Sequence, residues 1–271
     1  MTNVTVGRAE SAADAAEVRL EVDGGVATIV LARPRSLNAI TPRLLTELAD
    51  ALALSATDTR VRVAVIKGEG TTFCAGFDLK VDQTTSGPDE LRNKVERLHD
   101  ITRAIRRAPF PVIASVQGFA LGAGCELALC SDLVVASRDA QFGFPEVDVS
   151  LSVTGGISYL LPLAVGSVKA KELIFLGNRF SADDARAWNL INFVVDPDDL
   201  ESETAALAAR LASKPRLALT AAKGTLNAAA PGSIDQAYEI ETGYAVLTQA
   251  SAAASEAQAS FSARRKGGNE E

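Results

Sequence analysis

Two glutamates, Glu126 and Glu146, lie in tracts that are otherwise apolar and punctuated by glycine. Glu126 follows the glycine-rich run 118–125, and Glu146 follows the run 141–145. A carboxylate is costly to bury because desolvation disfavours its charged form. Two carboxylates in different surroundings can hold different protonation states at one pH, which general acid–base chemistry requires. A helix cap and a surface ion pair would explain the same residues, and spacing alone does not decide between these interpretations.

Composition narrows the possible classes of function. The 271 residues are 47% hydrophobic and 23% charged, which suffices to bury the core of one large or two modest domains. A net charge of −7 and a pI of about 5.0 argue against a general nucleic-acid binder. Three cysteines without a Cys-x-x-Cys pair and a single histidine, His99, argue against a disulfide framework and a metal site.

Targeting signals are not evident in the sequence. The alanine-rich residues 1–17 carry acids and have no basic start followed by an apolar core, so they do not resemble a signal peptide. No apolar run reaches membrane-spanning length. We therefore expect a cytoplasmic protein without a membrane partner.

Hydrophobic patterning predicts alternating strands and helices up to about residue 195, and only helices beyond it. This alternation indicates a layered α/β core. Strands are expected at residues 18–22, 26–31, 61–67, 112–116, 133–136 and 191–195. Helices are expected at residues 41–56, 89–107 and 121–130, as two short helices within 154–176, after Ser181, and across 198–265.

Three regions follow from this pattern: a disordered leader at residues 1–17, a core at 18–197 and a helical region at 198–271. The helices of the last region are rich in alanine, so packing on one another would bury little area per residue. Packing on a neighbouring subunit would bury more. We therefore expect an oligomer built through residues after about Pro197.

Two loops could supply backbone hydrogen-bond donors. The glycines of 118–124 do not have the Gly-x-Gly-x-x-Gly spacing of a dinucleotide site, but they lead into a helix whose first N–H groups can face a ligand oxygen. The loop 72–79 offers a second set. If the N–H groups of Phe77 and Ala123 converge, they form an oxyanion hole for a thioester carbonyl. A close-packed strand–helix turn would use the same glycines.

Four segments together resemble one enzyme family. These are residues 33–39 (Arg-Pro-Arg-Ser-Leu-Asn-Ala), 73–79 (Phe-Cys-Ala-Gly-Phe-Asp-Leu), 120–128 (Ala-Leu-Gly-Ala-Gly-Cys-Glu-Leu-Ala) and 142–147 (Phe-Gly-Phe-Pro-Glu-Val). In order and spacing they resemble the enoyl-CoA hydratase/isomerase (crotonase) family, over nearly the whole chain after residue 17. The resemblance implies an α/β fold with a core of repeated ββα units, and C-terminal helices that build a homotrimer or a dimer of trimers. It also implies an acyl-CoA substrate, no metal and no cofactor.

The resemblance also assigns site residues by position. Glu126 and Glu146 match the catalytic carboxylates, and Phe77 and Ala123 match the residues whose N–H groups form the oxyanion hole. The implied CoA contacts are Arg35, Leu37, Ala75, Gly76, Asp78, Leu79 and Gly122, with the C-terminal Phe261 and Arg264 near the adenine and phosphates.

The sequence thus predicts an enoyl-CoA hydratase of fatty acid metabolism that uses paired-glutamate acid–base catalysis. A 3,2-enoyl-CoA isomerase, which needs one carboxylate, and a non-catalytic acyl-CoA-binding protein are the alternatives. Phe77 is bulky where short-chain hydratases have small residues, and the segment 152–160 departs from the family pattern, so the acyl group stays open. His99 is interpreted as a helix residue rather than a catalytic base.

Overall fold

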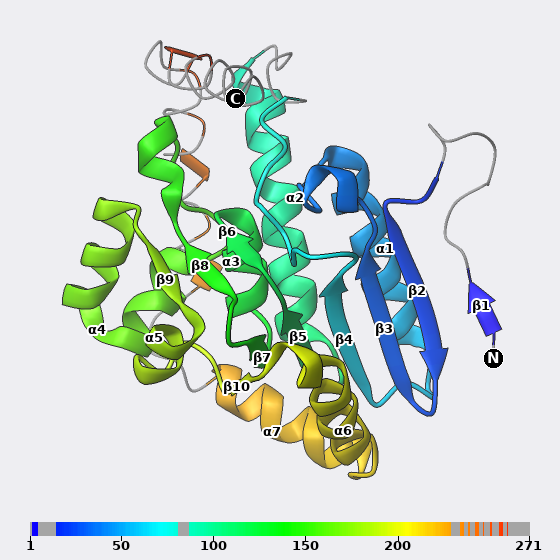
Figure 1. The fold of residues 1–271 in the computed structure, drawn as a ribbon. Coiled ribbons are helices and arrows are strands. Elements are labelled where there is room, and N and C mark those ends of the chain that lie inside the picture. The colour runs from blue at the N-terminus through cyan, green and yellow to red at the C-terminus, as the bar shows by residue number, and fades with distance from the viewer. Residues whose placement is uncertain are drawn as a thin grey trace.

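The structure is a computed structural model, and it describes part of the chain (Figure 1). The described residues are 2–4, 15–80, 87–228 and, beyond these, 234, 235, 238, 242, 243, 246, 250, 255, 256 and 259. Within the described stretches, no helix is long and apolar enough to cross a bilayer.

A seven-stranded sheet forms the centre of the fold, in the order β1-β2-β3-β4-β5-β7-β10. The first three strands are antiparallel, and β3, β4, β5, β7 and β10 run parallel to one another. The strands are β1 (Thr2–Val4), β2 (Val18–Asp23), β3 (Val26–Leu31), β4 (Val63–Gly68), β5 (Val112–Val116), β7 (Leu133–Ser137) and β10 (Phe193–Val195). The predicted strands are all present, and part of the predicted disordered leader, Thr2–Val4, pairs with β2.

Helices cover both faces of this sheet (Figure 1). Alternate residues of a strand face opposite sides, so Ala64 and Ile66 enter the main core while Val63 and Val65 pack with Leu200 of α6 on the other face. The helices are α1 (Pro42–Thr57), α2 (Pro88–Arg107), α3 (Ala123–Leu129), α4 (Ile157–Leu176), α5 (Ala182–Ala187), α6 (Leu200–Ala212) and α7 (Arg216–Ala228).

Local capping explains where several helices begin. The Thr41 hydroxyl accepts a hydrogen bond from Leu44 N at 3.0 Å, ahead of a proline at the first position of α1. Ser181 and Asp184 form a capping box at α5. In α4, Gly166 has non-helical dihedral angles, which divides the helix as the sequence predicts.

A second sheet of three short strands positions the glycine-rich tract. It consists of β6 (Phe119–Leu121), β8 (Gln141–Gly143) and β9 (Arg179–Ser181), with β6 and β8 parallel. The sequence analysis does not predict it, because three residues are too few to show a period of two. Gly122 N donates to Gly143 O at 2.9 Å, so this sheet sets the start of α3 beside the segment that leads to Glu146.

The first C-terminal helices pack on the same chain. Leu200 and Ala208 of α6 are buried against the sheet. On α7, Lys223 Nζ donates to Ile105 O at 2.6 Å and to Asp132 Oδ2 at 2.6 Å, which ties the helix to the end of α2. Burial lowers the pKa of Lys223, and the Asp132 charge opposes that shift.

Candidate active site

The start of helix α3 carries the first of the two glutamates. Gly122 has φ 53° and ψ −128° at the N-cap, a conformation that side chains disfavour, and Glu126 N donates to its carbonyl oxygen at 3.0 Å. The Glu126 side chain is completely buried. Helical geometry therefore places this carboxylate one turn into α3 and inside the protein.

Thr154 contacts both oxygens of the Glu126 carboxylate. Its backbone N–H donates to Oε1 at 2.6 Å and its hydroxyl donates to Oε2 at 2.8 Å. Gly155 follows with φ 63°, and a Cβ there would be 3.1 Å from Glu126 Oε2, so the chain passes directly over the carboxylate. Hydrogen-bond donors on both oxygens stabilise the negative charge of the Glu126 carboxylate in the protein interior. The sequence analysis misses Thr154, because nothing in its local pattern marks it as a partner of a residue 28 positions away.

Glu146 occupies different surroundings. It lies in the short 3₁₀-helix η3 (Pro145–Val149), and its Oε2 atom is buried with no hydrogen-bond partner among the described residues. Burial raises the pKa of Glu146 to about 7, while its own backbone N–H partly opposes the shift. A Cβ on Gly122 would be 2.9 Å from Glu146 Oε1, so this carboxyl lies against the N-cap of α3.

The structure therefore brings the two glutamates to one place. Glu146 contacts the N-cap of α3, and Glu126 lies four residues further along that helix, a spacing that puts residues on one face. Both charges act on the Cys125 thiol: burial is the main cause of its raised pKa, and the Glu146 and Glu126 charges add to that shift. One carboxylate that accepts two hydrogen bonds and one carboxyl whose pKa is raised to about 7 have the unequal surroundings that acid–base chemistry requires.

The two predicted donor segments also lie together. Ile40 N donates to Gly76 O at 2.8 Å and Asp78 N donates to Ile40 O at 2.9 Å, so the Phe77 N–H between them faces away from Ile40. A Cβ on Gly76 would be 3.6 Å from Ala123 N. Within the described part of the chain, neither the Phe77 N–H nor the Ala123 N–H donates to another protein group.

The loop of residues 33–39 lies against this segment. Ala75 N donates to Leu37 O at 3.0 Å, and Arg33 pairs with Asp78 at 3.0 Å. Asn38, which the sequence analysis does not select as a site residue, is buried and donates to Thr72 O at 2.6 Å. The predicted CoA contacts near the loop thus lie together: Arg35 and Leu37 are exposed, and Ala75, Asp78 and Leu79 are half-buried. Phe261 and Arg264 lie outside the described residues.

His99 lies in α2, as the sequence predicts. It is completely buried and stacks on the Tyr238 ring with centroids 4.5 Å apart. Its Nδ1 atom lies 3.4 Å from the Thr242 hydroxyl. These contacts indicate a packing role between α2 and the C-terminal segment. Within the described ranges, no group of three or more His, Cys, Asp and Glu side chains could hold a metal ion.

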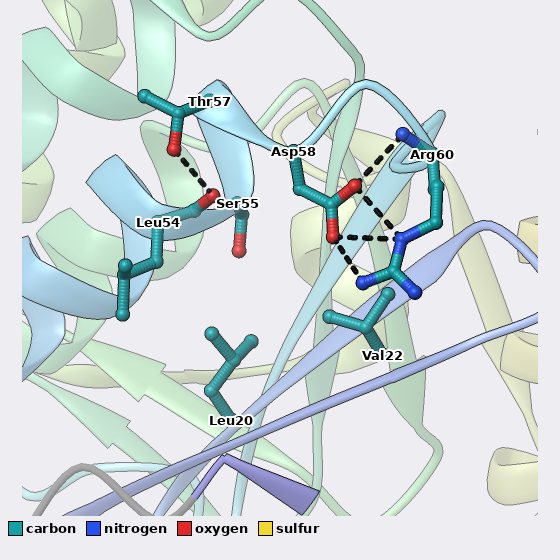
Figure 2. A pocket seen from close by; sticks show the side chains of 7 residues that line it. All are labelled: Leu20, Val22, Leu54, Ser55, Thr57, Asp58 and Arg60. Carbon is teal, nitrogen blue, oxygen red and sulfur yellow. Dashed lines mark hydrogen bonds and ion pairs between the residues drawn. The ribbon is translucent and has the colours of Figure 1, made fainter. Parts of the chain in front are cut away.

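A shallow pocket of about 260 Å³ lies elsewhere, between β2 and the end of α1 (Figure 2). Asp58 and Arg60 pair with each other at its rim, with 2.7 Å between Oδ2 and Nη2. The pocket is lined by Leu20, Val22, Leu54, Ser55, Thr57, Asp58 and Arg60, none of which is a predicted site residue.

The chain is similar to known proteins over most of its length. Residues 21–270 match the family model described as enoyl-CoA hydratase/isomerase. The chain is 36% identical to 1,2-epoxyphenylacetyl-CoA isomerase of Escherichia coli K12, over 90% of this chain and 94% of that protein. It is 35% identical to crotonyl-CoA hydratase of Syntrophomonas wolfei, over 91% of this chain and 95% of that protein.

A solved structure matches the fold as well. The crystal structure of an enoyl-CoA hydratase from Mycobacterium avium subsp. paratuberculosis superposes with a TM-score of 0.84 and 33% identity, covering 93% of this chain and 100% of that one. This likeness confirms the predicted α/β core with C-terminal helices.

Proposed function

Since this chain belongs to the enoyl-CoA hydratase/isomerase family, we propose that it is an enoyl-CoA hydratase, which adds water across the 2,3 double bond of an enoyl-CoA thioester. The observation that carries the proposal is the pair of buried glutamates with unequal surroundings. Glu126 accepts two hydrogen bonds from Thr154, whereas Glu146 has a pKa of about 7 and a buried oxygen with no partner in the described part of the chain.

The unequal surroundings divide the chemistry between the two residues. Glu126, ionised, takes a proton from water as the water oxygen bonds to Cβ of the acyl group. Glu146, protonated, delivers its proton to Cα, so the double bond becomes a single bond and one water is added. Proton transfer from Glu126 back to Glu146 restores the starting state. General acid–base assistance of this kind contributes about 10²–10⁴-fold.

Negative charge develops on the thioester oxygen during this step. The Phe77 and Ala123 N–H groups, from two segments that lie together, are placed to stabilise it, and one such donor contributes about 10²–10³-fold. The exposed loop with Arg35 and Leu37 lies beside them, and CoA binds there in this proposal. The step needs only water, the substrate and groups of the protein.

An isomerase is the second candidate, because the matching family model is described as enoyl-CoA hydratase/isomerase. A 3,2-enoyl-CoA isomerase moves one proton between Cα and Cγ and needs one carboxylate. Turnover of crotonyl-CoA against a 3-enoyl-CoA separates the two. Hydration of crotonyl-CoA as the faster reaction supports the hydratase, and turnover of the 3-enoyl-CoA alone supports the isomerase. Activity on neither leaves an acyl-CoA-binding protein.

The pH dependence should report the pair of glutamates, in which Glu146 is the acid. Because the acid must carry its proton, kcat/KM should fall on the alkaline side of about pH 7, tenfold per pH unit.

The stability of the fold gives a second measure of the Glu146 proton. The folded state holds this proton more tightly than the unfolded chain does, because the pKa of Glu146 is about 4.5 in the unfolded chain. The resulting stabilisation is complete below pH 4.5 and is lost as the pH rises through 7. Thermal melts between pH 5 and 8 should therefore show Glu146→Gln gaining stability relative to the unmodified protein.

We expect the protein to assemble as a homotrimer or dimer of trimers through its helices. Large apolar side chains are exposed on α4 and α7, including Val168 (82%), Phe175 (69%), Leu217 (81%) and Leu226 (75%). Leu217→Lys and Leu226→Lys together should shift the mass in sedimentation equilibrium towards the monomer. Leu54→Lys, at a less exposed position on α1 (45%), is the control. A stable monomer of the unmodified protein at micromolar concentration would refute the prediction.

A further inference from the structure

We propose that Thr154 is the positioning residue that orients Glu126 and keeps it ionised as the base of the reaction. This inference rests on the proposed hydration and extends it to a residue that acts through its hydrogen bonds to Glu126.

Thr154 makes its two side-by-side contacts with the carboxylate of Glu126. Thr154 places a backbone donor on Oε1 and a hydroxyl donor on Oε2, at 2.6 and 2.8 Å. One donor on each oxygen fixes the plane of the carboxylate as well as its position. A carboxylate oxygen accepts up to two hydrogen bonds, so this arrangement is compatible with a water held by the same group.

The segment that carries Thr154 is itself fixed. Its side chain is 4% exposed, and the Cys130 thiol donates to Gly155 O at 3.3 Å. A Cβ on Gly156 would be 3.0 Å from the Tyr238 ring, so the C-terminal segment packs behind the turn. Tyr238 in turn lies 3.1 Å from the Thr102 hydroxyl on α2. The donors are therefore held in place before a substrate arrives.

The consequence is a difference between the two carboxyl groups. Glu146 Oε2 is buried and accepts no hydrogen bond from any residue that the structure describes, while both Glu126 oxygens accept one from Thr154. Hydrogen bonds to the charged form favour it, and burial without them disfavours it. Removal of the Thr154 hydroxyl should make the two glutamates more alike and raise the pH at which Glu126 ionises.

Thr154→Val and Thr154→Ser test this inference, because valine keeps the shape and the backbone N–H while serine keeps the hydroxyl. On crotonyl-CoA, Thr154→Val should lower kcat about 10- to 100-fold, the effect of one hydrogen bond to a charged group, with KM within about twofold. The acid limb of its pH–rate profile should move to higher pH. Thr154→Ser should restore both. Circular dichroism and thermal melts confirm that each variant is folded.

Two results would overturn the inference: a folded Thr154→Val with an unchanged pH–rate profile, or a Thr154→Ser as impaired as Thr154→Val. If the unmodified protein hydrates no enoyl-CoA, the proposed function fails, and infrared spectroscopy still tests Thr154. The difference spectrum against Glu126→Gln isolates the Glu126 carboxylate band. That band should titrate at higher pH in Thr154→Val than in the unmodified protein, and an identical titration would refute the inference.

Discussion

Glu126→Gln and Glu146→Gln should each lower the hydration of crotonyl-CoA by about 10²–10⁴-fold, because each removes the proton acceptor or donor of the proposed step. The double variant should be little slower than the poorer single variant, since groups that act as a unit are not additive. Steady-state kinetics of the three variants on crotonyl-CoA and on a 3-enoyl-CoA measure this. An isomerase would instead lose activity through one substitution, while the other would mainly alter its substrate range.

The buried positions of the two residues require a folding control. Glutamine keeps the shape of glutamate, and Glu47→Gln, a substitution of another buried glutamate within α1, provides a comparison. Circular dichroism should show all variants folded. If either Glu126→Gln or Glu146→Gln hydrates crotonyl-CoA nearly as fast as the unmodified protein, that residue has no part in the mechanism. The hydratase assignment is then wrong as well.

Phe77→Pro should be far more damaging than Phe77→Ala. Proline lacks the N–H and fixes φ, so it removes one donor for the thioester oxygen, an expected loss of about 10²–10³-fold in kcat. Alanine keeps the N–H and removes the ring, which lies under Lys94 with its Nζ 4.1 Å from the centroid. Phe77→Ala should therefore retain activity and accept longer acyl chains.

A series of 2-enoyl-CoA substrates of increasing chain length measures both effects. The kcat of Phe77→Pro should be low for every chain length, and the KM of Phe77→Ala should fall for the longer chains. If both variants remain folded and lose activity equally, the separation between the backbone and side-chain roles of Phe77 is wrong.

Sequence patterns were sufficient for the elements with long, regular periods. The strand 112–116 and the break within α4 agree with the structure, and Thr41 caps α1 as the Thr-Pro pair predicts. The short strands β6, β8 and β9 could not be predicted, because each has three residues and depends on pairing with distant segments. Similarly, the packing of α6 on the sheet is a tertiary contact that composition does not encode.

In the candidate site, too, some residues could be identified from the sequence and others only from their tertiary contacts. Glu126 and Glu146 could be selected because a charge in a glycine-rich apolar tract is conspicuous, and the structure places both in the interior. Thr154 and Asn38 could not, since their importance comes from contacts with residues 28 and 34 positions away. Their residue types are common at turns, so nothing local distinguishes them.

The proposed oxyanion donors are backbone groups, and this affects how the protein can change by mutation. Every residue except proline carries an N–H, so nearly any substitution at Phe77 or Ala123 leaves the donor in place. The hydrogen bonds that align the loop, from Ile40 N to Gly76 O and from Asp78 N to Ile40 O, are also backbone bonds. Side chains around the acyl group can therefore vary while charge stabilisation persists. Such a scaffold can acquire new substrates by single substitutions without passing through an inactive intermediate.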